Sequence, residues 1–310
     1  MINDKAETEK EPYSDKENGQ DDGNVITMPA YAKVNVSLVV FGKRADGFHE
    51  LHTIMAPIGL CDQLTVRKNN GKGIFLRCFG GDAPDGPENL VFRAVELLAN
   101  YVGKELAVDI ELEKRIPSGA GLGGASSDAA ICLLAVNRLM NLGLTLIDLA
   151  ELAGELGSDV PFFLNNSVAL CKGRGEIVES LPLKMSRHIM LVLSGLHVAT
   201  PLIYKNYQYD EEKTTKQMES VDICLGQGDL DKLISLGINS LTEVTMSLFA
   251  PLRNLRDKLE QLGIGPVFMS GSGSTLFVTS EDIDQLKRWS KLIVEKKLAE
   301  TCITEIASQR

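Results

Sequence analysis

The chain has 310 residues, 44% of them hydrophobic, and a formal net charge of −10. That length and apolar content suffice for a substantial core in one large or two modest domains. No apolar run is long enough to cross a bilayer, the first residues are polar and the net charge is acidic, so we expect no membrane span, no secretory signal and no nucleic-acid partner. Six cysteines without a C-x-x-C spacing are typical of reduced thiols in a cytoplasmic protein.

Residues 1–27 form an acidic segment. Eight acidic residues stand there against three lysines, and the apolar residues show almost no periodicity. Such a composition buries too little apolar surface to offset the entropy of ordering, so we predict a disordered acidic tail. A tail with its own function stays open as the less favoured alternative to a solvated extension.

From residue 28 onward the apolar pattern predicts alternating strands and helices. In chain order these are strands at 34–41, 51–66 and 74–79, a helix at 89–101, a strand at 108–114, a helix ending near 143, a helix at 146–156, strands at 168–171, 176–181 and 189–193, helices at 223–236 and 252–262, strands within 267–277, a helix at 283–299 and a strand at 303–307. Residues 205–220 are polar and predicted to begin as a loop. Because no regular βαβ repeat emerges, we predict two α+β lobes, residues 28–182 and 183–310.

Residues 117–130 carry the most informative motif, Pro-Ser-Gly-Ala-Gly-Leu-Gly-Gly-Ala-Ser-Ser-Asp-Ala-Ala. Four glycines within six residues permit positive φ angles and leave no Cβ to hold a ligand away. Ser126, Ser127 and Asp128 can cap the helix that follows, and the N-terminus of that helix favours an anion. The motif predicts a phosphate-binding loop, since a turn with only a packing role accounts poorly for the entropic cost of four glycines.

Three other phosphate-binding patterns compete for this segment. Gly119, Gly121 and Gly124 match the dinucleotide-binding pattern G-x-G-x-x-G, which stays a less favoured alternative. The strand of such a fold is buried on both faces, whereas residues 108–114 alternate, and Pro117 interrupts the passage into the loop. The P-loop pattern fails because no Lys-Ser/Thr pair follows the glycines, and the protein-kinase pattern fails because the chain has neither H-R-D nor D-F-G.

Two further segments place charged residues in apolar surroundings. Lys33 and Asn35 alternate onto the same side of a strand, where an inward lysine needs a partner and an outward one would lie at a sheet edge. Asp159, in Gly-Ser-Asp-Val-Pro-Phe, follows a helix and precedes a proline, which is also the pattern of a helix N-cap. From the residues alone, Lys33 could be a buried lysine with a partner or a lysine at a sheet edge. Asp159 could be a helix N-cap or a carboxylate with a functional role.

The glycine-rich segment resembles the phosphate-binding loop of the GHMP kinases, Pro-x-x-x-Gly-Leu-Gly-x-(x)-Ser-Ser-x-Ala. Four more segments resemble motifs of one branch, the 4-diphosphocytidyl-2-C-methyl-D-erythritol kinases, in the right order. They are Ala-Lys-x-Asn continuing into Gly-x-Arg-x-Asp-Gly-Phe-His-Glu at 32–50, Gly-Ser-Asp-Val-Pro-Phe at 157–162, Thr-Pro-x-x-Tyr at 200–204 and Gly-Ser-Gly-Ser at 271–274. The resemblance implies a two-lobed α+β fold with an N-terminal lobe like domain 2 of ribosomal protein S5 and a ferredoxin-like C-terminal lobe.

What the resemblance implies about function is specific. It implies an ATP-dependent kinase that transfers a phosphoryl group to the 2-hydroxyl of a small molecule carrying a cytidine diphosphate, in the non-mevalonate route to isoprenoid precursors, with Mg²⁺ brought by the nucleotide. The implied catalytic residues are Lys33 and Asp159, the aspartate acting as base. The implied nucleotide-binding residues are Pro117, Gly119, Ala120, Gly121, Leu122, Gly123, Gly124, Ala125, Ser126, Ser127 and Asn89. The implied substrate-binding residues are Asn35, Phe48, His49, Thr200 and Tyr204.

In this scheme Phe48 and Tyr204 stack on the cytosine and His49 contacts its edge. Phe48 stands where the family more often has tyrosine, which removes one possible hydrogen bond and keeps the aromatic face. No protein metal site is expected, since His49-Glu50-Leu51-His52 lacks the H-E-x-x-H spacing. We expect a monomer or weak homodimer. The alternatives are another GHMP kinase, of the homoserine or mevalonate type, and a catalytically silent nucleotide-binding regulator.

Overall fold

The computed structural model describes residues 23–71, 73–165, 167–182 and 186–307. In chain order its elements are β1 (Val25–Lys43), β2 (His49–Lys68), β3 (Ile74–Phe79), α1 (Leu90–Val102), β4 (Val108–Glu113), α2 (Gly124–Leu139), α3 (Leu146–Leu156), the 3₁₀ helix η1 (Pro161–Leu164), β5 (Ala169–Gly173), β6 (Ile177–Ser180), β7 (Ser186–Leu193), α4 (Thr200–Asn206), α5 (Glu211–Gln227), α6 (Leu230–Leu236), α7 (Thr242–Leu248), α8 (Ala250–Gln261), β8 (Phe268–Met269), β9 (Leu276–Ser280), α9 (Ile283–Glu295) and β10 (Glu300–Ala307).

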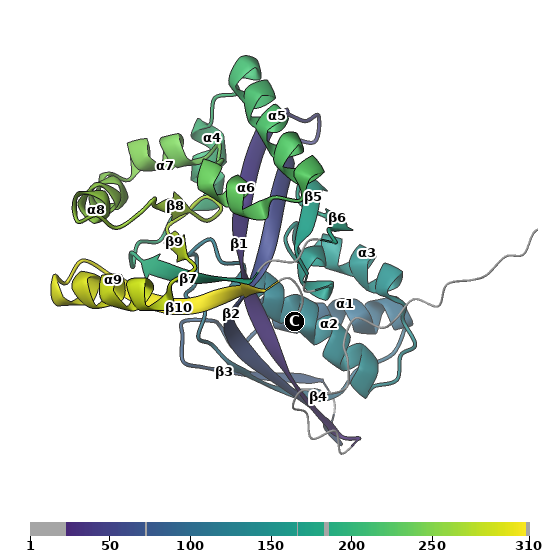
Figure 1. Cartoon of the computed structure of the whole chain (residues 1–310). Helices are drawn as coiled ribbons and strands as arrows, with labels where there is room; N and C mark the ends of the chain where they lie inside the picture. Colours follow the sequence, from purple (N-terminus) through teal and green to yellow (C-terminus); the bar gives the residue numbers. More distant parts are fainter. Residues whose placement is uncertain (1–22, 72, 166, 183–185, 308–310) are drawn as a thin grey trace, which may run out of the picture.

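The strands β1 and β2 organise the molecule. They pair antiparallel and run through its middle, from the β3–β4 end to the α4–α5 end (Figure 1). The described strands form one sheet in the order β3-β4-β2-β10-β7-β9-β8, with β1 and β5 also paired to β2, and β6 to β5. The last strand, β10, joins the lobes: it pairs with β7 along its length and with β2 where Ile306 faces Ile58.

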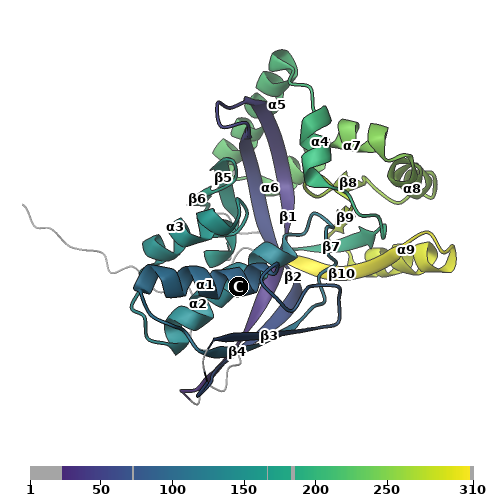
Figure 2. The ribbon, with the colours of Figure 1, turned by 180° about the vertical axis from the view of Figure 1, so that it is seen from behind.

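Helices α1, α2 and α3 pack on one another, and α2 packs against β1 and β2; the three helices stay together on one flank of the molecule when the view is turned (Figure 2). β4 alternates buried and exposed residues, as predicted, and its apolar side chains enter the core that these helices share. Local signals start two of the helices: Asn89 caps α1, and Thr145 and Asp148 form a capping box on α3. This lobe supplies the rigid base from which the glycine-rich loop extends.

The other half of the molecule has two further cores. Helices α5 and α6 cover the far end of β1 in one cluster of buried side chains, and α7, α8 and α9 enclose β7, β8 and β9 in another. The predicted two-lobed α+β fold is confirmed. The predicted boundary near residue 182 stays a prediction, and residues 183–185 lie outside the described ranges.

The structure departs from the predicted elements at three places. The loop predicted at the start of 205–220 is confined to residues 207–210, because α4 ends at Asn206 and α5 begins at Glu211 behind the N-cap Asp210. The helix predicted at 223–236 is two helices, since Gly228 adopts a left-handed conformation (φ 66°) that ends α5. Helix α7 had no counterpart in the predicted elements. Sparse apolar residues explain the first difference, because α5 buries only Thr214, Val221 and Cys224.

The predicted acidic tail ends earlier than residue 27. β1 begins at Val25, and Ile26 is only 6% exposed in the core, so residues 25–27 belong to the sheet. The remainder of that prediction, residues 1–22, lies outside the described residues. Within the described part of the chain, the longest and most apolar helices fall short of what a membrane crossing requires.

Candidate active site

The glycine-rich loop leads from β4 to α2 in a conformation that needs glycine. Gly119, Gly121 and Gly123 have φ angles of 63°, 77° and 72°. A Cβ on Gly121 would lie 2.6 Å from the carbonyl oxygen of Ser270, and one on Gly123 would lie 2.7 Å from the Phe163 ring. Only backbone therefore lines this part of the loop, which is what a close approach to phosphate requires.

Hydrogen bonds from distant parts of the chain hold the loop. The Lys33 amide donates to the Leu122 carbonyl (3.0 Å), and the Thr275 amide donates to the Ala120 carbonyl (3.2 Å). The Ser270 hydroxyl donates to the Gly121 carbonyl at 3.0 Å. The resembling segment Gly271-Ser272-Gly273-Ser274 thus lies beside the glycine loop, as the resemblance implied.

The expected capping by Ser126, Ser127 and Asp128 was wrong. Helix α2 begins at Gly124 with Gly123 as its N-cap, and no side chain caps its first turn. Ser126 and the largely buried Asp128 line the cavity, whereas Ser127 is buried outside its wall. An N-terminus without a side-chain cap keeps its amide donors and the positive end of its dipole for an anion.

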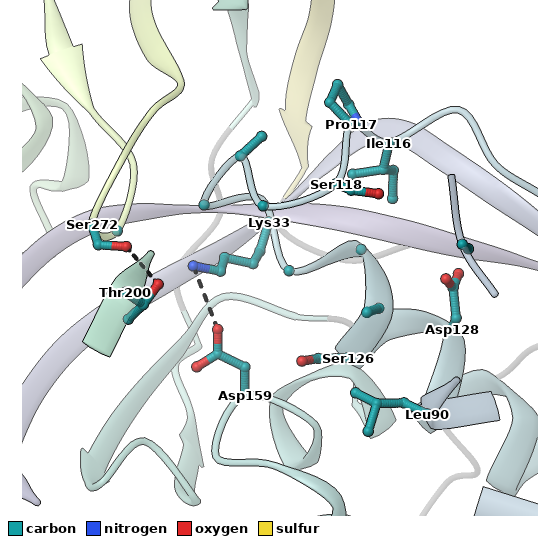
Figure 3. Close-up of a pocket in the computed structure, with 18 of the residues that line it drawn as sticks. Lys33, Leu90, Ile116, Pro117, Ser118, Ser126, Asp128, Asp159, Thr200 and Ser272 are labelled. Atoms are coloured by element: carbon teal, nitrogen blue, oxygen red, sulfur yellow. Dashed lines mark hydrogen bonds and ion pairs between the residues drawn. The ribbon is translucent and has the colours of Figure 1, made fainter. Parts of the chain in front are cut away.

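A cavity of about 510 Å³ lies under the loop (Figure 3). Its wall is formed by the loop together with residues of β1, β2, the segment 82–90 and the 271–272 turn. The predicted nucleotide-binding residues Pro117, Gly119, Ala120, Gly121, Gly123, Gly124, Ala125, Ser126 and Asn89 all line it, and Leu122 and Ser127 do not. The two exceptions are buried in the protein, 1% exposed each.

Lys33 points into this cavity towards Asp159 (Figure 3). Its ammonium lies 3.6 Å from the Asp159 carboxylate and donates to the Asn35 side-chain oxygen at 2.7 Å. The Asn35 amide is held in turn by the Thr53 hydroxyl at 2.8 Å. Lys33 is 3% exposed, so the sheet-edge alternative is wrong. The ion pair is buried on the lysine side only, because the Asp159 side chain is 35% exposed.

Asp159 does not serve as the N-cap that its position in the sequence suggested. The residue before η1 is Val160, and no side chain caps that short helix. The carboxylate instead lies in the walls of two cavities, the one under the glycine loop and a second one of about 680 Å³. The two cavities share Leu51, Asp159, Thr200 and Tyr204, so they meet at the carboxylate.

Aromatic side chains dominate the second cavity. It is lined by Phe48, His49, Tyr204, Tyr207 and Tyr209, with Lys43, Arg174 and Lys205 at its charged parts. The His49 ring lies 5.4 Å from that of Tyr204 and 5.8 Å from that of Tyr207. Burial, and then the nearby Lys43 charge, lower the pKa of His49. Its imidazole is therefore neutral at pH 7, with one donor and one acceptor nitrogen.

Phe48 and Tyr204 line the same cavity without touching each other's rings. Phe48 is 51% exposed, and the Arg174 guanidinium lies 5.1 Å from its ring centroid. Thr200 shares a hydrogen bond with Ser272 at 2.8 Å (Figure 3). The cytosine clamp stays a prediction. Arg174, Tyr207 and Lys43 were not among the predicted site residues.

Asn89 has a structural role as the N-cap of α1. The sequence indicated only that it lies at the start of a helix. Its side-chain oxygen accepts from the Val91 amide at 2.9 Å, and its amide donates to the Pro84 carbonyl at 2.8 Å. The residue lines the first cavity beside Leu90. Its contact with an adenine stays a prediction.

A second lysine, Lys114, lies behind the loop and was missed. Its ammonium donates to the carboxylates of Asp62 and Asp128, and all three side chains are 6% exposed or less. Among the described residues, no group of three or more His, Cys, Asp or Glu side chains gathers to hold a metal.

Known proteins resemble the chain in sequence and in structure. The model of the GHMP kinases N terminal domain matches residues 89–167, and that of the GHMP kinases C terminal domain matches residues 225–289. A 4-diphosphocytidyl-2-C-methyl-D-erythritol kinase from Geobacter sp. (strain M21) is 41% identical over 83% of this chain and 90% of its own length. One from Pelotomaculum thermopropionicum is 38% identical over 85% and 92%.

Among solved structures, a 4-(cytidine 5'-diphospho)-2C-methyl-D-erythritol kinase superposes with a TM-score of 0.72 at 35% identity, covering 91% of this chain and 99% of its own. A homoserine kinase from Cytophaga hutchinsonii superposes with a TM-score of 0.73 at 19% identity, covering 95% and 98%. The second likeness shows a shared fold alone.

Proposed function

Because the chain belongs to the GHMP kinases and, among them, to the 4-diphosphocytidyl-2-C-methyl-D-erythritol kinase family, we propose that it transfers the γ-phosphoryl group of ATP to the 2-hydroxyl of 4-diphosphocytidyl-2-C-methyl-D-erythritol. The observation that carries this proposal is the meeting of the two cavities at Asp159. One cavity has the glycine loop and the uncapped helix end that suit phosphates, and the other has the aromatic rings that suit a pyrimidine.

In the proposed reaction, Asp159 takes the proton of the 2-hydroxyl as the hydroxyl oxygen attacks the γ-phosphorus. The bond from that phosphorus to the β–γ bridging oxygen breaks, and ADP leaves. Lys33, held by Asn35, lies close to the Asp159 carboxylate and offsets negative charge that develops as the hydroxyl attacks. Magnesium bound to the nucleotide would neutralise charge on the transferring group.

Positioning and electrostatics account for the chemistry, with no covalent intermediate on the protein. The N-terminus of α2 and the glycine backbone bind and orient the phosphates. Phe48 and Tyr204 contribute aromatic faces to the cytosine, and the neutral His49 can pair with the donor and acceptor groups of its edge. Arg174 lies at the same cavity and offers its guanidinium to the substrate's diphosphate.

An assay of coupled ADP release tests the proposal. The full chain is supplied with Mg²⁺ and ATP and with one of three acceptors, the diphosphocytidyl compound, mevalonate or homoserine. We expect turnover with the first and background rates with the others. Preference for mevalonate or homoserine would replace the substrate assignment and keep a GHMP kinase. Nucleotide binding without turnover of any acceptor would favour the silent regulator.

A further inference from the structure

The buried network of Lys114 with Asp62 and Asp128 lies directly behind the glycine loop and is not used in the proposed reaction. Lys114 follows β4, Asp62 comes from β2 and Asp128 from the first turns of α2, so the network ties together the three elements that flank the loop. Asp62 also accepts from the backbone amides of Arg115 (2.5 Å) and Ile116 (2.8 Å). Those two peptides lead into the loop, and Asp62 therefore fixes where the loop begins.

The charges in this network do not balance. One ammonium stands between two carboxylates, and Asp62 and Asp128 are 0% and 2% exposed. One carboxylate oxygen of Asp128 accepts a hydrogen bond from the Lys114 ammonium at 2.5 Å. The other oxygen is buried with no hydrogen-bond partner among the described residues. A buried carboxylate with an unpaired oxygen is costly in its ionised form, and protonation lowers that cost.

The network is also close to where phosphates would bind. The Lys114 ammonium lies 3.4 Å from the position that a Cβ on Gly124 would take, and Gly124 is the first residue of α2. Asp128 contributes to the wall of the nucleotide cavity. Asp128 lines the cavity that would hold the phosphates and is buried, and charges in a buried site interact more strongly than in water, so an ionised Asp128 would oppose a bound phosphate.

We propose that Asp62, Lys114 and Asp128 form a positioning network for the phosphate loop, in which Asp128 holds a proton while a nucleotide is bound. The inference rests on the nucleotide-binding half of the proposed function. Burial raises the pKa of Asp128 to about 7, with Lys114 opposing this rise and Asp62 adding to it. The Asp128 charge also contributes to raising the pKa of two thiols, those of Cys78 on β3 and Cys132 on α2.

The sign of the expected effect follows from that proton. Below about pH 7 Asp128 is already protonated, so binding of an anion costs no proton uptake. Above it, the bound phosphates favour the protonated form, and the protein takes up a proton as the nucleotide binds. Nucleotide affinity should therefore fall as the pH rises from 6.5 to 8.5, by about tenfold.

The experiment is calorimetric titration of the full chain with Mg·ADP at pH 8, in buffers of different ionisation enthalpy, which counts protons taken up. We expect uptake approaching one proton for the unmodified chain and none for Asp128→Asn, whose affinity should hardly change with pH. The matched control is Glu96→Gln, an exposed carboxylate on α1 that does not line the cavity, which should behave like the unmodified chain.

Each result is decisive. Binding without proton uptake, or uptake that survives in Asp128→Asn, overturns the inference and leaves the proposed function intact. Absence of Mg·ADP binding overturns the proposed function itself. If Asp128→Asn does not fold, carbon-13 spectra of aspartate carboxyl groups in the unmodified chain replace it. A buried carboxyl that stays protonated at pH 8 only in the Mg·ADP complex supports the inference, and its absence rejects it.

Discussion

Two lysine–aspartate sites flank the glycine loop, and they are built in opposite ways. At the front, Lys33 and Asp159 are 3.6 Å apart, and the Asp159 side chain is 35% exposed. At the back, Lys114 donates directly to both of its carboxylates, and none of the three side chains exceeds 6% exposure. Both lysines are buried, so the difference lies in how far each aspartate is opened to the cavities.

This difference in exposure distinguishes a site that can take part in proton transfer from a site that stabilises the fold. A carboxylate with a loose partner and an open face can receive a proton from a bound hydroxyl. A carboxylate such as Asp62, which already accepts from Lys114 and from two backbone amides, has no room for an outside partner. Stability and catalysis should therefore respond in opposite order to substitutions at the two sites.

The largest expected effect is on turnover at the front site. Asp159→Asn keeps the shape of the side chain and removes the base, so kcat should fall by about 10²–10⁴-fold while both substrates still bind. Steady-state rates with the diphosphocytidyl substrate, together with nucleotide titration, measure the two halves of this statement. Turnover close to that of the unmodified chain would show that Asp159 is not the base.

The back site should dominate stability. Asp62→Ala leaves Lys114 short of a partner and two backbone amides unpaired, and should lower the free energy of unfolding by about 3–5 kcal/mol. Asp159→Ala breaks a looser pair and leaves buried Lys33 with its hydrogen bond to Asn35, so it should cost less, about 1–2 kcal/mol. Urea denaturation of both variants makes the comparison, and equal losses would contradict the distinction between the two sites.

The front site is open to the second cavity, where we expect the cytosine of the substrate to stack on Tyr204. Base–aromatic stacking contributes roughly 1–3 kcal/mol per ring, so Tyr204→Ala should raise the KM for the diphosphocytidyl substrate by about 5- to 150-fold. The KM for ATP should hardly change, and Tyr204→Phe should be mild because it keeps the ring. Melting curves serve as the control, since a ring that only packs would lower stability and affect both substrates alike.

The smallest effect is expected far from both sites. The composition of residues 1–22 predicts that deleting them changes neither activity nor the thermal midpoint measurably. Deleting residues 1–27 removes buried Ile26 as well as the β1 pairs of residues 25–27 with β2. It should lower stability by about 1–3 kcal/mol. Thermal melts of the two truncated chains decide, and a fall with the shorter deletion would assign the acidic segment a structural role.

Motif spacing predicted the front site well because its residues lower the stability of the fold unless they bind a ligand or an oppositely charged partner. Glycines at 119–124 lose more backbone entropy than other residues would, and a lysine in an apolar strand needs an opposite charge. The structure brings Lys33 within reach of Asp159. The back site was missed although a signal existed. Lys114 has the same alternation parity as Val108, Ile110 and Leu112, which all point into the core.

Other errors came from signals that tertiary contacts override. Ser126, Ser127 and Asp128 have the composition of caps, yet the helix starts two residues before Ser126, so they lie inside its first turns. Helix α5 buries little, and its polar sequence gave no clear period. The ring contacts of His49, and that of Arg174 with Phe48, join segments that lie far apart in the sequence, which no local pattern encodes.

The hydrogen bonds that hold the glycine loop can form only in a fixed order as the chain is synthesised. Ser270 comes 149 residues after the Gly121 carbonyl that it holds. At about 5–20 residues per second, the serine that holds the loop is synthesised roughly 7 to 30 seconds after Gly121. The glycine loop therefore gains its full set of holding contacts only after the segment around residue 270 has been synthesised.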